Sequence, residues 1–213
     1  MTTKTLTYLF DPLCGWCYGA SPAIQQLGQH AAIRLELLPT GLFAGAGGRT
    51  LDAAFADYAW SNDQRIEKLT GQRFTEDYRT KILGQPGSRF DSATSTLALT
   101  AVALTAPLHE LEALKVLQEA RYIHALDTTA VPVVETLLRD IGLDAAADRF
   151  VTGDTELLAA NAARIQKAQG LMQTFGAQGV PALVVTDENG SRLLRGNALY
   201  GSFDVLLSHI AAA

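Results

Sequence analysis

Cysteine is scarce in this chain, which has two among 213 residues. Two cysteines are too few for the disulfide framework that holds many small secreted domains together. The chain does not need such a framework, because 48% of its residues are hydrophobic and its length allows a sizeable core to be buried. We therefore expect its stability to depend neither on disulfides nor on a structural metal.

Positive charge and long hydrophobic runs are also lacking. The 17 Lys and Arg residues are outnumbered by 22 Asp and Glu, the net charge is −5, and no basic cluster favours binding to a phosphate backbone. No stretch reaches the roughly 18 apolar residues of a membrane span. Residues 93–106 come nearest, but serines and threonines interrupt or border them. The apolar run at residues 6–10 is too short for a signal-peptide core. We expect no nucleic-acid partner, no membrane partner and a cytoplasmic location.

Histidine is the third residue in short supply. The chain has four, and none is spaced as a metal ligand relative to the others: His30, His109, His124 and His209. A zinc site normally uses four protein ligands, or three ligands and a water. We therefore expect no metal site.

The two cysteines that are present stand three positions apart, in Cys14-Gly15-Trp16-Cys17. Only the thiolate of cysteine is reactive, and the start of a helix favours an anion through its free N–H groups and dipole. We expect Cys14 to be an exposed nucleophile at such a helix start. Cys17, one turn further, would attack the resulting mixed disulfide. Two other interpretations stay open, namely inert core cysteines or half of a zinc site.

The first part of the chain predicts a β-α-β unit. Residues 5–10 read as a buried strand, a helix starts at Cys14, and residues 33–38 alternate as a second strand. The connection is long enough for the two strands to be parallel. Residues 51–171 then carry apolar residues at helical spacing.

Strand character returns near the end of the chain. Residues 180–186 predict a strand, residues 187–190 a hairpin turn, and residues 191–195 the return strand. Ser202 can cap a last helix that extends to residue 210. The order β-α-β, helices, β-β-α predicts an α/β layer architecture.

The segment Asp11-Pro12-Leu13-Cys14-Gly15-Trp16-Cys17-Tyr18-Gly19 resembles the opening of the DsbA-like thiol–disulfide oxidoreductases, especially their cytosolic FrnE-like branch. The resemblance covers most of the chain in order. It implies a thioredoxin fold with a large all-helical insertion between the βαβ and ββα halves. Residues 1–42 and 172–213 would form the discontinuous thioredoxin-like domain, and residues 43–171 the helical insertion domain.

Two prolines extend this resemblance. Pro22 lies eight residues after Cys14, where thioredoxins kink the active-site helix. Val180-Pro181 stands where the family carries a cis-proline facing the cysteine pair. The resemblance implies that Val180 offers its backbone to an extended substrate and that Pro181 shields the thiols. The alternative is a trans-proline that starts an edge strand.

Two positions depart from the family pattern. Tyr8 replaces the buried carboxylate found six residues before the first cysteine, so Asp11 becomes the candidate proton acceptor, unless it is only a turn residue. Gly15-Trp16 lacks the histidine of DsbA, which predicts a less oxidising couple. Trp16 either contacts substrate or packs under the insertion.

Several aromatic residues lie in or after a glycine-rich loop at residues 41–48. The loop lacks the ending of a phosphate-binding loop and fits a flexible loop beside an active-site cleft better. Phe43, Phe55, Tyr58 and Trp60 either line a groove between the domains or belong to the core. Helical spacing favours the core for Phe55 and Tyr58.

These features predict a protein-disulfide oxidoreductase or isomerase with Cys14, Cys17 and Pro181 as catalytic residues. It would act on protein or peptide disulfides, with no cofactor besides the dithiol and with glutathione as a possible co-substrate. A reducing cytosol favours reductase or isomerase work. One alternative is a glutathione-dependent transferase or isomerase like the kappa class, although those usually carry serine where Cys14 stands. Another is a chaperone-like binding module switched by its disulfide.

Overall fold

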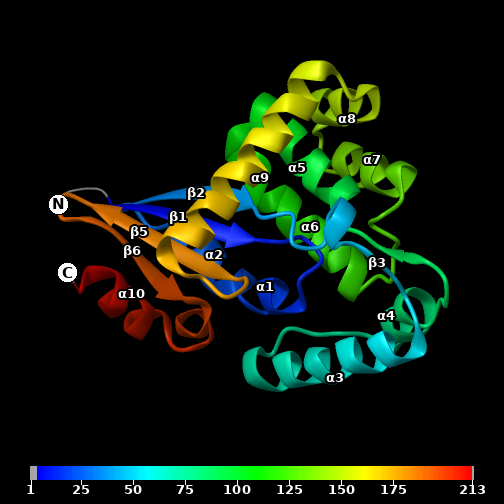
Figure 1. Ribbon diagram of the computed structural model, residues 1–213, viewed down its shortest axis with the longest axis horizontal. Coiled ribbons are helices and arrows are strands. Elements are labelled where there is room, and N and C mark those ends of the chain that lie inside the picture. Colours follow the sequence, from blue (N-terminus) through cyan, green and yellow to red (C-terminus); the bar gives the residue numbers. More distant parts are fainter. Residues whose placement is uncertain (1–3, 213) are drawn as a thin grey trace.

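The computed structural model describes residues 4–212, and a four-stranded mixed sheet lies at one end of it (Figure 1). The strand order is β2-β1-β5-β6, with β1 parallel to β2 and both other pairs antiparallel. The strands are β1 (Lys4–Phe10), β2 (Ile33–Pro39), β5 (Ala182–Asp187) and β6 (Gly190–Arg195). The patterns predict this order of strands, and the family resemblance implies that it belongs to a thioredoxin fold.

Helices make up most of the remaining described residues. They are α1 (Gly15–Gly19), α2 (Ser21–Gly28), α3 (Ala53–Thr70), α4 (Glu76–Tyr78), α5 (Ala93–Thr105), α6 (Glu110–Tyr122), α7 (Val131–Asp140), α8 (Asp144–Thr152), α9 (Thr155–Phe175) and α10 (Phe203–Ala211). The insertion also contains a short antiparallel pair, β3 (Arg49–Thr50) with β4 (Arg89–Phe90). No helix within residues 4–212 is both long and apolar enough to cross a membrane.

The helix that follows the cysteine motif is interrupted where Pro22 predicts a kink. α1 ends at Gly19 and α2 begins at Ser21, with Pro22 in the first turn of α2. Proline has no N–H to donate, so it fits a first turn but not the interior of one continuous helix. The break separates a five-residue helix, which Cys14 caps and which contains Cys17, from the helix that packs on the sheet.

The sheet is covered on both faces, and alternation along β1 assigns its side chains to them. Leu6 belongs to the cluster that contains Ile24 of α2 and Leu206 of α10. Leu9 belongs to a second cluster, with Ala168 of α9. In Figure 1, α9 runs from the α7–α8 end of the molecule across the sheet. The predicted division at residues 171 and 172 stays a prediction, and it lies inside this helix.

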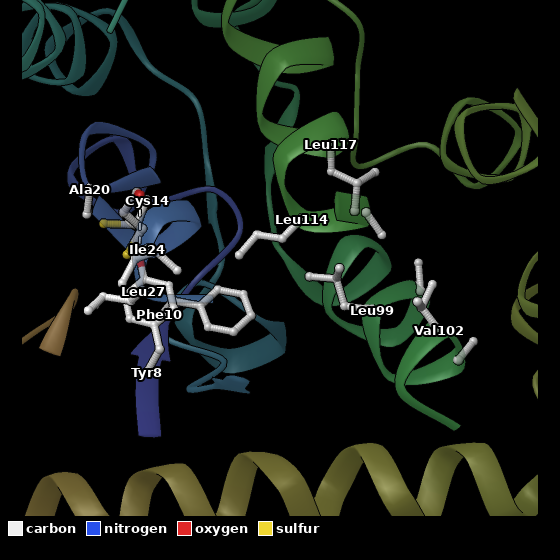
Figure 2. Packing of buried hydrophobic residues seen from close by; sticks show 14 of the residues in the cluster. Tyr8, Phe10, Cys14, Ala20, Ile24, Leu27, Leu99, Val102, Leu114 and Leu117 are labelled. Carbon is white, nitrogen blue, oxygen red and sulfur yellow. Dashed lines mark hydrogen bonds between the residues drawn. The ribbon is translucent and has the colours of Figure 1, made fainter. Parts of the chain in front are cut away.

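The core continues from the sheet into the insertion. Figure 2 shows Phe10 of β1 facing the α5 and α6 side chains of the same cluster, among them Leu99 and Leu114. The cluster reaches further to buried residues of α7 and α8, such as Leu138 and Phe150. One apolar interior therefore positions the insertion against the cysteine-bearing end of β1.

Candidate active site

Cys14 occupies the N-cap of α1, directly after the turn that ends β1. Its backbone is extended (φ −83°, ψ 115°), its N–H donates to the Asp11 carbonyl at 3.1 Å, and its carbonyl accepts from Tyr18 N–H at 3.0 Å. The side chain is only 7% exposed, which is less than the sequence predicts. The cause is tertiary, because residues far along the chain cover the thiol from one side and the wall of a cleft borders it on the other.

Cys17 lies one turn into α1 and is 1% exposed. Both cysteines are free thiols. Burial raises the pKa of the Cys17 thiol well above its ordinary value, and the hydrogen bond to the Cys14 thiol raises it further. The backbone N–H of Asp11 partly offsets this rise. Cys17 therefore holds its proton until a base accepts it, and Cys14 is the thiol open to the cleft.

Val180 and Pro181 lie beside Cys14 although they are distant in sequence. The peptide bond between them is cis, as the family resemblance implies. The Cys14 thiol donates to the Val180 carbonyl oxygen across a 3.7 Å Sγ–O distance. The loop after β6 packs tightly against Pro181, because a Cβ atom on Gly196 would lie 2.1 Å from the Pro181 oxygen. The sequence-predicted residues Cys14, Cys17, Val180 and Pro181 thus form one group.

Asp11 is fully buried, and its carboxylate fastens the segments around the motif. It accepts from Leu13 N–H at 2.9 Å, from Phe43 N–H at 3.0 Å and from the Ser92 hydroxyl at 2.8 Å. Burial raises the pKa of Asp11, and these three hydrogen bonds work against the rise. The glycine-rich loop therefore does border the site, and Asp11 ties it down through Phe43.

A cleft of about 260 Å³ opens in front of Cys14. The start of α1 forms one wall, and residues from the glycine-rich loop, from α3 and from the aromatic residues near α4 and α6 form the others. Its lining consists of Leu13, Cys14, Gly15, Trp16, Phe43, Arg49, Phe55, Tyr58, Ala59, Asn62, Asp63, Ile66, Tyr78, Phe90 and Tyr122. A pocket that is mostly apolar, with a few polar groups beside a thiol, suits a small peptide better than a highly charged ligand.

Trp16 is half-buried at the edge of this cleft. Its ring lies 5.3 Å from the ring of Tyr200, whose hydroxyl donates to the Trp16 carbonyl at 3.0 Å. The guanidinium of Arg65 lies 5.9 Å from the Trp16 ring. Trp16 therefore combines packing with an accessible surface beside the nucleophile.

The aromatic residues of the insertion divide between cleft and core. Phe43 and Phe55 lie in the cleft lining, each edge-on to Phe90 at centroid distances of 5.0 and 5.2 Å. Tyr58 is 66% exposed, so its assignment to the core is wrong. Phe55 is half-buried rather than in the core. Trp60 is buried in a separate aromatic cluster. Helical spacing alone cannot tell a face turned to a cleft from a face turned to the core.

Asp63 is the main residue that sequence reasoning missed. It is 4% exposed, lies in the cleft lining, and accepts from the Tyr78 hydroxyl at 3.2 Å. Burial raises its pKa to about 7, while Tyr78 and the charge of Arg121 act in the opposite direction. One signal could have found it, because Asp63 interrupts the buried stripe of α3 between Trp60 and Ile66.

Tyr8 occupies the position where the family carries a buried carboxylate. It is 1% exposed, and its hydroxyl donates to the Cys17 carbonyl at 3.4 Å. Burial raises the pKa of Tyr8 well above its ordinary value, so it remains a neutral phenol near Cys17. Tyr8 therefore occupies the position of the family's carboxylate without supplying its negative charge.

Among residues 4–212, no three His, Cys, Asp or Glu side chains gather as a metal site would require. The two thiols, one partly covered at the cleft and one behind it, are arranged for thiol–disulfide exchange.

Comparison with known proteins gives a family match and several similar structures. Residues 5–210 match the model of the family described as DSBA-like thioredoxin domain. No curated protein matches the chain. The structure is similar to the cytosolic disulfide reductase DsbM from Pseudomonas aeruginosa, with 28% identity, a TM-score of 0.85 and 97% of each chain covered. The same reductase with GSH gives 29% identity, a TM-score of 0.83 and 97% coverage of both chains.

A third similar structure comes from Nitrosomonas europaea and is described as a candidate protein disulfide isomerase. It is 21% identical, with a TM-score of 0.81 over 98% of this chain and 96% of the other. At that identity the likeness establishes the fold alone.

Proposed function

The chain belongs to the DSBA-like thioredoxin domain family, and from this membership we propose that it is a cytoplasmic disulfide reductase acting through Cys14 and Cys17. Its fold is that of the DsbA-like thiol–disulfide oxidoreductases. The substrates would be peptide or protein disulfides, with glutathione as the co-substrate that restores the dithiol.

The observation that carries the proposal is the placement of the Cys14 thiol. It lies 3.7 Å from the Val180 carbonyl oxygen and at the wall of a mostly apolar cleft, with Cys17 buried behind it. A substrate peptide that reaches Cys14 would pair with the Val180 backbone while its disulfide meets the thiol. This arrangement supports attack by one thiol and resolution by the other.

In the proposed reaction, the Cys14 thiolate attacks one sulfur of the substrate disulfide, whose S–S bond breaks. A mixed disulfide forms and the first substrate thiol leaves. Cys17 then loses its proton and attacks the Cys14 sulfur, which releases the second substrate thiol and leaves a Cys14–Cys17 disulfide. We propose Asp11 as the acceptor of the Cys17 proton, because its carboxylate is buried and near enough for its charge to raise the pKa of Cys17.

The Asp11→Asn variant should release mixed disulfides more slowly, while Cys14 should attack the substrate as fast as before. Stopped-flow measurement of both phases can test this.

The reducing direction is supported by two considerations. DsbM, the similar protein from Pseudomonas aeruginosa, is a cytosolic disulfide reductase and is also known with GSH. The Gly15-Trp16 dipeptide lacks a histidine that could stabilise the thiolate. We therefore expect a reduction potential well below the roughly −120 mV of DsbA.

A redox titration against glutathione tests this function, with thiol alkylation and mass spectrometry as the readout. We expect a reversible two-electron transition in the wild type and a mixed disulfide on Cys14 when Cys17 is replaced by serine. The Cys14→Ser variant is the control and should form none. Glutathione binding without any reversible disulfide would refute the reductase and favour the kappa-class-like transferase. Unfolded-protein binding that survives loss of both thiols would favour the binding module.

A further inference from the structure

The carboxyl group of Asp63 lies against the cysteine motif. A Cβ atom on Gly15 would lie 2.5 Å from Asp63 Oδ1 and 3.7 Å from its Cγ. Asp63 thus packs directly on the residue after Cys14. Both Asp63 and Cys14 line the same cleft. A substrate disulfide that reaches Cys14 therefore enters a space that Asp63 borders.

The two oxygens of this carboxyl group are in different surroundings. Oδ2 accepts the hydrogen bond from Tyr78, whereas Oδ1 has no hydrogen-bond donor among residues 4–212. Oδ1 is also the atom that packs against Gly15, at the nucleophile's end of the cleft. One oxygen is consequently anchored, and the other is available to a group bound in the cleft.

Arg121 of α6 is a buried, positively charged residue close to this wall of the cleft. It is 1% exposed, and its Nε and Nη1 atoms have no partner among the described residues. Its guanidinium lies 5.6 Å from the Tyr78 ring and 5.3 Å from the Phe90 ring, both of which line the cleft. A buried guanidinium needs a counter-charge, and an ionised Asp63 would provide one. The positive charge of Arg121 lowers the pKa of Asp63, so it favours the carboxylate that Asp63 becomes when it gives up a proton.

We propose that Asp63 is a catalytic residue that donates a proton to the substrate sulfur displaced by Cys14. The inference rests on the disulfide exchange proposed above. As the Cys14 thiolate forms its bond to one substrate sulfur, the substrate S–S bond breaks and its electron pair stays on the other sulfur. That sulfur takes the proton of Asp63 and leaves as a thiol, and the Asp63 carboxylate regains a proton from water.

Proton affinities favour this transfer. A displaced alkyl thiolate has a pKa of about 8.5, so an acid that titrates near neutral pH gives up its proton to it readily. The pKa of Asp63 is raised to about 7, and burial is the main cause. The titratable and charged groups that face Asp63 are Tyr78 of α4, Arg121 and Tyr122 of α6, and Cys14 at the start of α1. Acid assistance should therefore fade as the pH rises through about 7.

The test compares reagents that differ in what they need from a proton donor, in a Cys17→Ser background so that mixed disulfides accumulate. Oxidised glutathione releases an alkyl thiolate, an Ellman-type aromatic disulfide releases a stable thiolate, and iodoacetamide releases iodide. At pH 6, Asp63→Asn should slow attack on oxidised glutathione by about 10-fold or more. Attack on the aromatic disulfide and alkylation by iodoacetamide should change by less than about 2-fold, because neither leaving group needs a proton.

Asp57→Asn is the matched control, since it makes the same substitution at an exposed position of α3. Equal slowing with all three reagents, or no slowing with any, would overturn the role of Asp63. Failure of the function itself looks different, because the variant that keeps Asp63 would then be alkylated normally but would not react with oxidised glutathione.

Tyr78→Phe provides a second variant if Asp63→Asn folds poorly. It keeps the ring but removes the hydrogen bond that lowers the pKa of Asp63. The rate with oxidised glutathione, divided by the alkylation rate, should then fall at a higher pH than in the parent. An unshifted profile would contradict the proposal.

Discussion

Gly15 shows at the scale of one residue how the insertion constrains the cysteine motif. Alanine usually improves a helix over glycine by up to about 1 kcal/mol. A Cβ atom on Gly15 would instead meet Asp63 Oδ1 at 2.5 Å and Ile66 Cδ1 at 3.2 Å. The limited space under α3 therefore restricts which residue can stand at position 15, in addition to any demand of the redox chemistry.

We expect Gly15→Ala to lower the free energy of unfolding by about 1–3 kcal/mol, because buried groups must shift to admit the methyl group. Urea denaturation measures this change. Gly170→Ala in α9 is the control, since a Cβ atom there meets nothing within 4 Å, and it should raise stability by roughly 0.5–1 kcal/mol. A stabilising Gly15→Ala would show that the contact with Asp63 relaxes without cost.

Asp63 also predicts a pH dependence of stability. Its pKa rises from 3.8 to about 7 on folding, so between these values the folded state holds a proton that the unfolded state has lost. Asp63 therefore lowers stability as the pH rises through this window and has its full effect above it. Asp63→Asn should gain about 2–3 kcal/mol relative to wild type between pH 5 and pH 8.

Urea denaturation of both proteins at several pH values checks this. Asp57→Asn should follow the wild-type curve, because Asp57 is exposed. Parallel curves for wild type and Asp63→Asn would mean that Asp63 titrates normally.

At the scale of elements, two arginines join helices in different ways. Arg164 of α9 is largely buried and donates to the Leu37 carbonyl of β2 at 2.8 Å and the Thr100 hydroxyl of α5 at 3.1 Å. It also forms an ion pair with Glu110 of α6, which is buried as well. Arg164 thus ties the sheet to three helices of the insertion.

We expect Arg164→Met to lower the free energy of unfolding by about 3–5 kcal/mol, because it leaves the Glu110 carboxylate buried without its partner.

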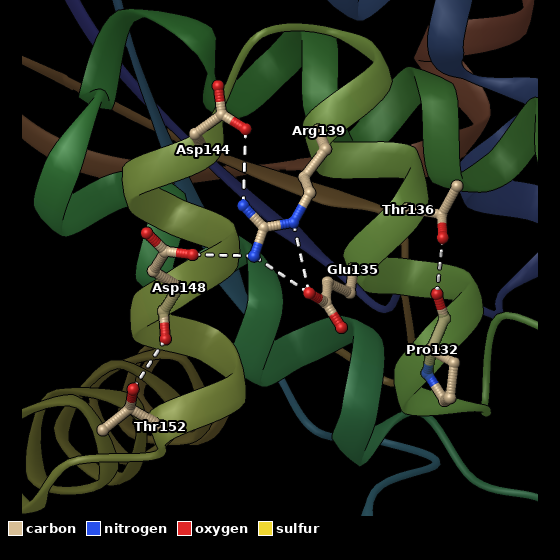
Figure 3. Close-up of polar contacts among 7 residues, drawn as sticks. All are labelled: Pro132, Glu135, Thr136, Arg139, Asp144, Asp148 and Thr152. Carbon is tan, nitrogen blue, oxygen red and sulfur yellow. Dashed lines mark hydrogen bonds and ion pairs between the residues drawn. The ribbon is translucent and has the colours of Figure 1, made fainter.

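The second arginine, Arg139 of α7, joins Glu135 of its own helix with Asp144 and Asp148 of α8 (Figure 3). Its side chain is 38% exposed, so water and salt weaken these pairs, and Arg139→Met should cost much less stability than Arg164→Met. Thermal denaturation in low and high salt distinguishes the two, and equal losses would contradict this account.

At the scale of the whole molecule, the two predicted domains share one core. The same cluster holds Leu6 and Phe10 of the sheet and Leu99 and Leu138 of the insertion, and α9 packs on both. If either part exposed its share of this apolar surface to water, the free energy of the molecule would rise. The division at residue 171 would then mark a change of architecture rather than of folding unit.

We therefore expect the chain to unfold in one cooperative step. The two tryptophans can report on the two predicted domains, because Trp16 of α1 packs on Tyr200 and Trp60 belongs to α3 of the insertion. Trp60→Phe and Trp16→Phe each leave one reporter, and each fluorescence midpoint in urea should match the midpoint by circular dichroism of the same variant. Separate midpoints within one variant would show that the two parts unfold independently.

The sequence by itself determined the features that depend on neighbouring residues. The buried run at residues 5–10 and the alternation along residues 33–38 predict the parallel pair, and Cys14 marks the helix start because a strand ends just before it. Pro22 predicts the helix break through its missing N–H. The position of the cis bond before Pro181 followed from the family resemblance, because the residue pair itself permits both isomers.

Only the tertiary structure decided what surrounds these features. Cys14 meets the Val180 carbonyl across 166 residues of sequence, and Asp63 reaches Gly15 from a separate helix. Tyr58 turns outward although its spacing fits a buried face. A periodic pattern fixes which side chains share a face of a helix, but the packing of distant segments fixes what that face meets. The cysteine pair was therefore readable in the sequence, whereas the contact of Asp63 with Gly15 and the set of distant residues that line the cleft were not.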